Sequence, residues 1–515
     1  VANALNMEGP VGKYRGEHFD VYSKPLRMRY GDVHTVFDFN DMVALPRHIV
    51  ERFNGSVMAI TGFEPNMVRV TGGVESLVPC TELYNHHWSN LMHGAASKAV
   101  EGMDKLPYWA YPGAAIGESG RFLTLPPRAS KRRLRRPPAK HTGHGFPEWR
   151  ELLDESASPV EPQDAQFFSE GNGNEHRLSY HGYPRRYAQL IRSPVAFSPG
   201  LMFINTKHPN RTGHGDVVPK VSLQPADADY SALLECPCST RRKMNISAGT
   251  IDGRKVSFGC VYSGIESEMA RRKNTACQME TLHGGSKCCN NGMVLLDANQ
   301  PQPEAVDEYF FKTRFYFEDY MPGSHQNLFR AYWQSELKNN EFDIPACDPG
   351  TPPSQCVYSL SATFQAGDPH SGWWSADPTR ELSWPTDGRG VKLIYAGGHC
   401  HVGCLSLELY DADTGKLVCR NAPTHGSSTS KWNDEAMNER GYAIAIPPCV
   451  WGDDPSEEGL LQRPPVIKPT TRLTTIARYN STKLRQDQPL PIAHYAVMAM
   501  WQMRAAYPND EGFHV

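Results

Sequence analysis

The segment YAGGHCHVGCLSLELYDADTGKL, residues 395–417, carries two histidines at a spacing that suits metal chelation. Successive side chains of a β-strand point to opposite faces, so we expect His399 and His401 to lie on the same face. Two imidazoles on one face can bind one ion, and Gly397, Gly398 and Gly403 would allow close approach of the backbone. The alternative is a solvated strand edge with two incidental histidines.

A second group of histidines lies in LYNHHWSNLMHG, residues 83–94. On a regular strand the adjacent His86 and His87 point to opposite faces, so a shared ion requires a bulge, a strand end or different ring nitrogens. Taken alone, this pair also suits a purely structural role. The HH pair and the HxH pair together supply several imidazoles, which are ligands that suit copper.

This combination resembles the type II copper, ascorbate-dependent monooxygenases, the family of peptidylglycine α-hydroxylating monooxygenase. In that family the HH segment contributes to a copper ion that donates electrons. The HxH segment contributes to a second copper ion, where dioxygen reacts. A histidine completes the first site and a methionine completes the second.

The resemblance implies a ligand set for each of two copper ions. For the electron-donating copper the set is His86, His87 and His208, the last from GLMFINTKHPN, with His176 and His181 as further candidates for the third position. For the oxygen-reacting copper the set is His399, His401 and His494, the last from AHYAVMAMWQMR, with Met498, Met500 and Met503 as nearby alternatives.

The sequence departs from the family pattern at three positions. His494 falls where the family has its methionine, and an all-imidazole site would differ in redox behaviour from one with a thioether. Gly397 stands where the peptide-binding enzyme has an arginine that anchors the substrate carboxylate, and Met498 stands where it has a tyrosine. A peptide ending in glycine is therefore not the expected substrate.

Over the whole chain the sequence is also similar to the plant stress-up-regulated nodulin-type extracellular proteins. The similarity lies in GSVMAITGFE, LYNHHW and GGHCHVGCLSLELYDADTG. It implies a related fold and an extracellular setting, without implying a reaction.

Short β-rich runs between turn residues predict an all-β fold. They lie at 56–63, 67–73, 187–197, 200–206, 255–264, 308–320, 356–366, 391–398, 404–412, 442–450 and 472–482. We expect two tandem antiparallel β-sandwich domains of the jelly-roll type with long loop insertions, because 515 residues exceed one ordinary core. The first spans 1–300 and includes a basic, proline-rich insertion near 120–145, and the second spans 301–515 and carries the HxH motif.

Cysteine usage and sequons predict a secreted or cell-surface glycoprotein. The chain has 13 cysteines, and N-x-S/T sequons occur at Asn54, Asn210, Asn245 and Asn480. Cys347 and Cys356 flank a short proline-rich loop and are expected to form a disulfide. Cys400 is expected on the face opposite the two histidines, in the core or in a disulfide. The opening VANALNMEGP suggests a processed mature chain.

The charge balance excludes some partners. The formal net charge is -3, which gives no electrostatic reason to bind nucleic acid. The sequence contains no run of 18 apolar residues, so no transmembrane segment is predicted.

The expected function is copper-dependent hydroxylation of a C–H bond in a small molecule or extracellular polymer, with dioxygen and ascorbate or another one-electron donor. The alternative is a non-catalytic structural or binding glycoprotein on the same scaffold.

Overall fold

The structure is a computed structural model that describes the chain in segments. They are residues 14–36, 41–101, 103–108, 122–125, 160–169, 179–207, 249–251, 254–256, 303–334, 342–368, 388–401, 403–426, 439, 442–482 and 492–508. Most of the basic insertion at 120–145, along with His176, His208, Asn210 and Asn245, lies outside these residues.

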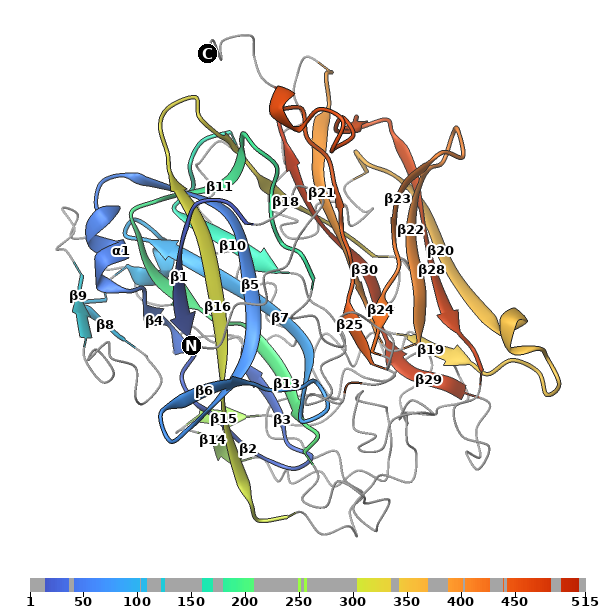
Figure 1. Cartoon of the computed structure of the whole chain (residues 1–515), viewed down its shortest axis with the longest axis horizontal. Coiled ribbons are helices and arrows are strands. Elements are labelled where there is room, and N and C mark those ends of the chain that lie inside the picture. Colours follow the sequence, from blue (N-terminus) through green and yellow to red (C-terminus); the bar gives the residue numbers. More distant parts are fainter. Residues whose placement is uncertain are drawn as a thin grey trace.

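The fold is all-β, as the sequence predicts, and its sheets are antiparallel except for a short parallel pairing at the edge of one sheet. Figure 1 shows two groups of sheets side by side. The first group contains a seven-stranded sheet of β1 (Glu17–Tyr22), β2 (Leu26–Arg29), β5 (Val57–Thr71), β6 (Val74–Leu77), β11 (Tyr187–Arg192), β16 (Val306–Asp319) and β17 (Gln326–Asn327). Facing it is a six-stranded sheet of β3 (Val33–Val36), β4 (Val43–Ala44), β7 (Leu83–Gly94), β10 (Ala165–Ser169), β12 (Pro194–Ser198) and β13 (Leu201–Asn205).

The second group is a smaller sandwich. Its five-stranded sheet contains β18 (Phe329–Gln334), β21 (Val391–Cys400), β26 (Cys449–Val450), β27 (Val466–Ile467) and β30 (Ala499–Ala506). Its four-stranded sheet contains β20 (Val357–Gln365), β22 (Cys404–Asp411), β23 (Leu417–Asn421) and β28 (Arg472–Asn480).

The remaining described elements are short. Four pairs of strands form two-stranded sheets: β8 (Lys105–Pro107) with β9 (Phe122–Thr124), β14 (Gly249–Ile251) with β15 (Arg254–Val256), β19 (Phe342–Pro345) with β29 (Ile492–Val497), and β24 (Thr424–His425) with β25 (Ala443–Ala445). The helix α1 (Arg47–Arg52) precedes β5. No helix in the described segments combines the length and the apolar character needed to cross a membrane.

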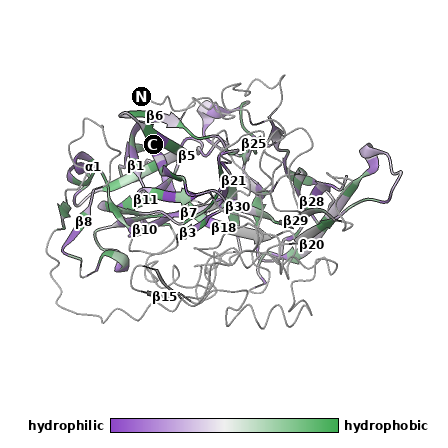
Figure 2. Ribbon diagram, turned by 90° about the horizontal axis from the view of Figure 1, so that it is seen from below, coloured by the Kyte–Doolittle hydropathy of each residue, from purple (hydrophilic) through white to green (hydrophobic). Residues whose placement is uncertain are grey.

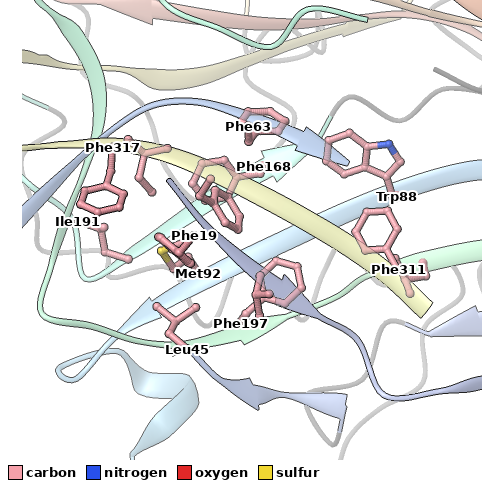
Figure 3. Close-up of a cluster of buried hydrophobic side chains, with 14 of the residues drawn as sticks. Phe19, Leu45, Phe63, Trp88, Met92, Phe168, Ile191, Phe197, Phe311 and Phe317 are labelled. Carbon is pink, nitrogen blue, oxygen red and sulfur yellow. The ribbon is translucent and has the colours of Figure 1, made fainter. Parts of the chain in front are cut away.

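Each sandwich buries the apolar faces of its own sheets. In the first, aromatic side chains from both sheets interdigitate, among them Phe63, Trp88, Phe168, Phe311 and Phe317 (Figure 3). The second core lies between the five-stranded and four-stranded sheets. Figure 2 shows the apolar residues on strands such as β1, β10 and β11. The side chains of β11 are buried along nearly the whole strand, from Tyr187 to Ile191.

The change from one sandwich to the other falls later in the chain than the boundary expected at residue 300. Strand β16 begins at Val306 and pairs with β1, β2 and β5, so it belongs to the seven-stranded sheet of the first sandwich. β17 pairs with β11 of the same sheet. The strands of the second sandwich begin with β18 at Phe329.

The two sandwiches share a buried interface. Ile394 and Tyr395 of β21 and Ile444 of β25 belong to the same apolar cluster as the core of the first sandwich. The Tyr395 hydroxyl donates to the backbone oxygen of Tyr180 at 3.0 Å. The two halves of the chain are therefore packed together at residues that precede His399 on its own strand.

Candidate metal centre

Strand β21 brings His399 and His401 together, as the period of two predicts. The centroids of their imidazole rings are 5.2 Å apart, and both side chains are fully buried. They do not lie on a solvated strand edge. Cys400 points the other way and belongs to the core of the second sandwich, where it is a thiol rather than half of a disulfide.

A tyrosine and a glycine position the end of this strand. The Tyr479 hydroxyl, from β28 of the facing sheet, accepts from the backbone N–H of His401 at 3.0 Å and donates to the backbone oxygen of Met498. Gly403 has a φ of 84°, the left-handed conformation that glycine adopts without strain. The backbone N–H of Cys404 then donates to the oxygen of His401 and closes the turn into β22.

A bulge in β7 sets the direction of His86. In the pairing with β13, Met202 lies opposite His87 and Phe203 lies opposite Asn85, so His86 is the extra residue of the strand. A bulge is one of the features that adjacent histidines on a strand require if both are to bind one ion. The rings of His86 and Tyr84 have centroids 6.0 Å apart, so the two residues share a face. The side chain of His87 lies outside the description.

The structure brings His86 to the HxH pair. The ring centroids of His86 and His401 are 5.0 Å apart at an interplanar angle of 81°, and His86 is 1% exposed. His86 belongs to the first sandwich and His401 follows a strand of the second. The two histidine segments, expected in separate copper sites, thus meet at the interface between the halves. We call His86, His399 and His401 the histidine cluster.

Strand register places a thioether beside this cluster. Met500 of β30 lies directly opposite His399 of β21, and paired residues of an antiparallel ladder share a face. Met500 is buried, and its Sδ is 3.9 Å from Nε2 of Gln502. His494 lies earlier, on β29, where it pairs with Ile344, and its side chain is outside the description. By register, Met500 rather than His494 is the late-strand residue next to His399.

Of the other histidines expected as ligands, His181 packs against aromatic side chains of the first sandwich, and His176 and His208 lie outside the described residues. His181 stacks on Phe63, with ring centroids 4.9 Å apart, and burial lowers its pKa to about 3. His181 is therefore a neutral core residue.

Two of the four sequons lie in the described residues: Asn54 is exposed beside α1, and Asn480 is half-buried at the end of β28. The expected disulfide between Cys347 and Cys356 is confirmed, and a second joins Cys419 and Cys449.

The donor chemistry of the cluster fits copper, and its spacing fits imidazoles that share an ion. Two imidazoles at tetrahedral angles, with metal–nitrogen bonds of about 2 Å, have ring centroids about 5 Å apart. The separations of 5.0 Å and 5.2 Å agree with this value, and they also lie in the ordinary range of edge-to-face ring contacts. Within the described side chains, no set of three or more His, Cys, Asp or Glu residues surrounds one point. The cluster consists of two adjoining pairs with His401 in common.

A cavity lies on the other side of β7. Its lining includes Pro65, Met67, Leu83, Asn85 and Phe311. Asn85 and Leu83 share a face of β7, and His86 and Tyr84 share the opposite one. The cavity therefore belongs to the interior of the first sandwich, and the histidine cluster belongs to the interface.

Comparison of the chain with known protein families and with curated proteins finds no match. The function is therefore argued from the histidine cluster itself.

Proposed function

We propose that this chain is a secreted copper-binding protein that resembles the type II copper monooxygenases and hydroxylates a C–H bond with dioxygen and an external reductant such as ascorbate. The observation that supports this proposal is the meeting of His86 with His399 and His401 in a buried cluster. Imidazole rings at this spacing are suited to copper. Two disulfides in the second sandwich agree with an oxidising compartment.

The residues that would supply imidazoles to copper are two adjoining pairs, His86 with His401 and His399 with His401, and Met500 lies opposite His399. Bound copper would supply one-electron chemistry with dioxygen, and the protein would supply geometry and access. Tyr479 fixes the backbone at His401, and the bulge in β7 fixes His86. Burial of the rings excludes bulk water from this face of β21. His87, His208 and His494 are further ligands implied by the family resemblance.

One observation favours a second candidate, a non-catalytic extracellular structural or binding glycoprotein on the same scaffold. The three imidazoles are at most 1% exposed, so a substrate has no open approach to them in this conformation. The exposed sequon at Asn54 is compatible with a glycan in both candidates. Under the second candidate the cluster would bind an ion without turnover.

The experiment that tests the proposal is the copper content of the purified chain, measured by elemental mass spectrometry after reconstitution. We expect bound copper in the natural chain, less in a His399→Ala/His401→Ala variant, and the natural amount in His48→Ala, which removes an exposed imidazole on α1. Ascorbate-driven oxygen consumption that requires the copper would support the monooxygenase. Copper without oxygen consumption would favour the second candidate, and no bound copper would contradict the proposal.

A further inference from the structure

The histidine cluster joins two parts of the chain that fold into different sheets. His86 lies on β7 of the six-stranded sheet, and His399 lies on β21 of the five-stranded sheet. His401 immediately follows β21. Any ion held by His86 and His401 together would therefore connect the two sandwiches.

Hydrogen bonds between the two halves of the chain hold the sandwiches together. The backbone N–H of Ile446 donates to Ser179 Oγ at 2.9 Å, and the backbone N–H of Cys80 donates to Glu439 Oε1 at 3.0 Å. Together with the bond from Tyr395 to Tyr180, these contacts span the interface between residues before 208 and residues after 390. The two sandwiches that carry His86 and His401 are thus joined by direct hydrogen bonds as well as by apolar packing.

Two separate copper sites require the HH and HxH segments to lie apart, each completed by its own third ligand. The ring centroids of His86 and His401 are 5.0 Å apart, slightly closer than those of His399 and His401, the pair expected to chelate one ion. One ion between the two rings could be bound by both, whereas separate ions would each have to lie on the side of its ring that faces away from the other ring.

We propose that His86 and His401 ligate the same copper ion, so that the metal closes the interface between the two sandwiches. This inference rests on the proposed copper binding and changes its ligand set. His399 lies beside His401 on the same segment of chain, and Met500 lies opposite His399. Metal binding would stabilise the closed arrangement because the ion binds only when both sandwiches supply their ligands.

The experiment compares copper equivalents in the full chain, stripped with a chelator and reconstituted with Cu(II) alone. The variants are His86→Ala, His401→Ala and the double variant, with His48→Ala as the control. A shared ion predicts that each single variant loses the same equivalent and that the double variant loses no more than either one. Additive losses would overturn the shared site while leaving copper binding intact, whereas no copper in the natural chain would overturn the proposed function as well.

A second measurement keeps the test independent of misfolding. Circular dichroism checks each variant, and His86→Gln and His401→Gln replace any alanine variant that does not fold. Copper is expected to raise the unfolding temperature of the natural chain and of His48→Ala, and to leave that of both single variants unchanged. An equal rise in His86→Ala and in the natural chain would contradict a bridge between the sandwiches.

Discussion

At the scale of single residues, one hydroxyl holds the end of β21. Tyr479 accepts from the backbone N–H of His401 and donates to the backbone oxygen of Met498, the residue between β29 and β30. Tyr479 is fully buried, so no water replaces these bonds when the hydroxyl is removed. It fixes His401 from the facing sheet without being a ligand.

Tyr479→Phe should therefore weaken both stability and metal binding. The buried N–H of His401 would lose its acceptor, at a cost of about 1–3 kcal/mol in the free energy of unfolding. Urea unfolding and copper competition with a chelator measure the two effects. Tyr358→Phe, on the neighbouring strand β20, is the control. A variant with natural stability and natural affinity would show that the hydroxyl does not position His401.

A second residue predicts how stability depends on pH. Glu64 of β5 is 2% exposed and accepts from the Tyr316 hydroxyl at 2.5 Å. Burial, opposed by that hydrogen bond and by Arg314, raises the pKa of Glu64 to about 7. The folded state therefore keeps a proton that the unfolded state releases near pH 4.5, and stability decreases as pH rises through this range.

Glu64→Gln should remove this decrease, which amounts to about 3 kcal/mol between pH 4.5 and 7. Urea denaturation over a series of pH values measures the slope for both proteins. Glu308→Gln, which removes a surface carboxylate paired with Arg27 on the same sheet, is the control. Identical slopes in the natural chain and in Glu64→Gln would show that Glu64 is not the titrating group.

At the scale of strands, a disulfide links the two sheets of the second sandwich. Cys419 lies on β23 of the four-stranded sheet, and Cys449 lies on β26, opposite Ala396 of β21. The Asn421 amide donates toward Cys419 Sγ at 3.4 Å. Gly398 lets the strand approach closely here, because a Cβ at this position would lie 2.8 Å from Oδ1 of Asn421. The disulfide thus joins the four-stranded sheet to β26, the strand that pairs with β21.

Replacing Cys419 and Cys449 by serine should lower the free energy of unfolding by about 2–4 kcal/mol. This disulfide spans 30 residues and the one between Cys347 and Cys356 spans 9. In the chain-entropy description the longer loop should cost about 1 kcal/mol more. Denaturant unfolding of the two double-serine variants compares them directly. A larger loss for the shorter loop would show that loop length does not decide the contribution.

The sequence predicts strands well and their partners poorly. The spacing of His399, Cys400 and His401 correctly predicts which side chains share a face, because alternation is a local property. The runs at 56–63 and 67–73 form the single strand β5, which continues through Pro65. β16 pairs with β5 there, opposite Thr313. On the other side of β5, the pairing with β11 ends at Ile60 and the pairing with β6 begins at Val68. Pro65 lies between these two ladders, so its missing N–H removes no hydrogen bond from either of them.

The candidate site shows the same limit. Alternation places His399 and His401 together, and the need for a bulge at His86 follows from the HH spacing. The contact between His86 and His401 joins residues more than 300 positions apart, and no local pattern encodes it. The position of Met500 opposite His399 depends on the register between β21 and β30, which is set by packing.

At the scale of the whole molecule, the two sandwiches are not independent along the chain. β16 lies between β1 and β5 in the seven-stranded sheet, although it follows residue 300. Its apolar residues Phe311, Phe315 and Phe317 lie in the core of the first sandwich. β1 and β2 both pair with β16.

A fragment of residues 1–300 should therefore not fold, whereas a fragment of residues 1–328 should gain the missing strand. We expect a cooperative urea transition, measured by tryptophan fluorescence, only in the longer fragment. The full chain provides the reference signal. A cooperative transition in the shorter fragment would show that the first sandwich forms without β16.

The place of β16 in the sheet also determines when the protein can fold during its synthesis. More than half of the chain leaves the ribosome before Val306 does. Until then, the apolar faces of β1 and β5 have no partner strand between them, and exposed strand edges of this kind favour aggregation. The seven-stranded sheet therefore stays incomplete until β16 is available to pair with both strands. The sandwich that comes first in the sequence is completed only after Asp319 has been made.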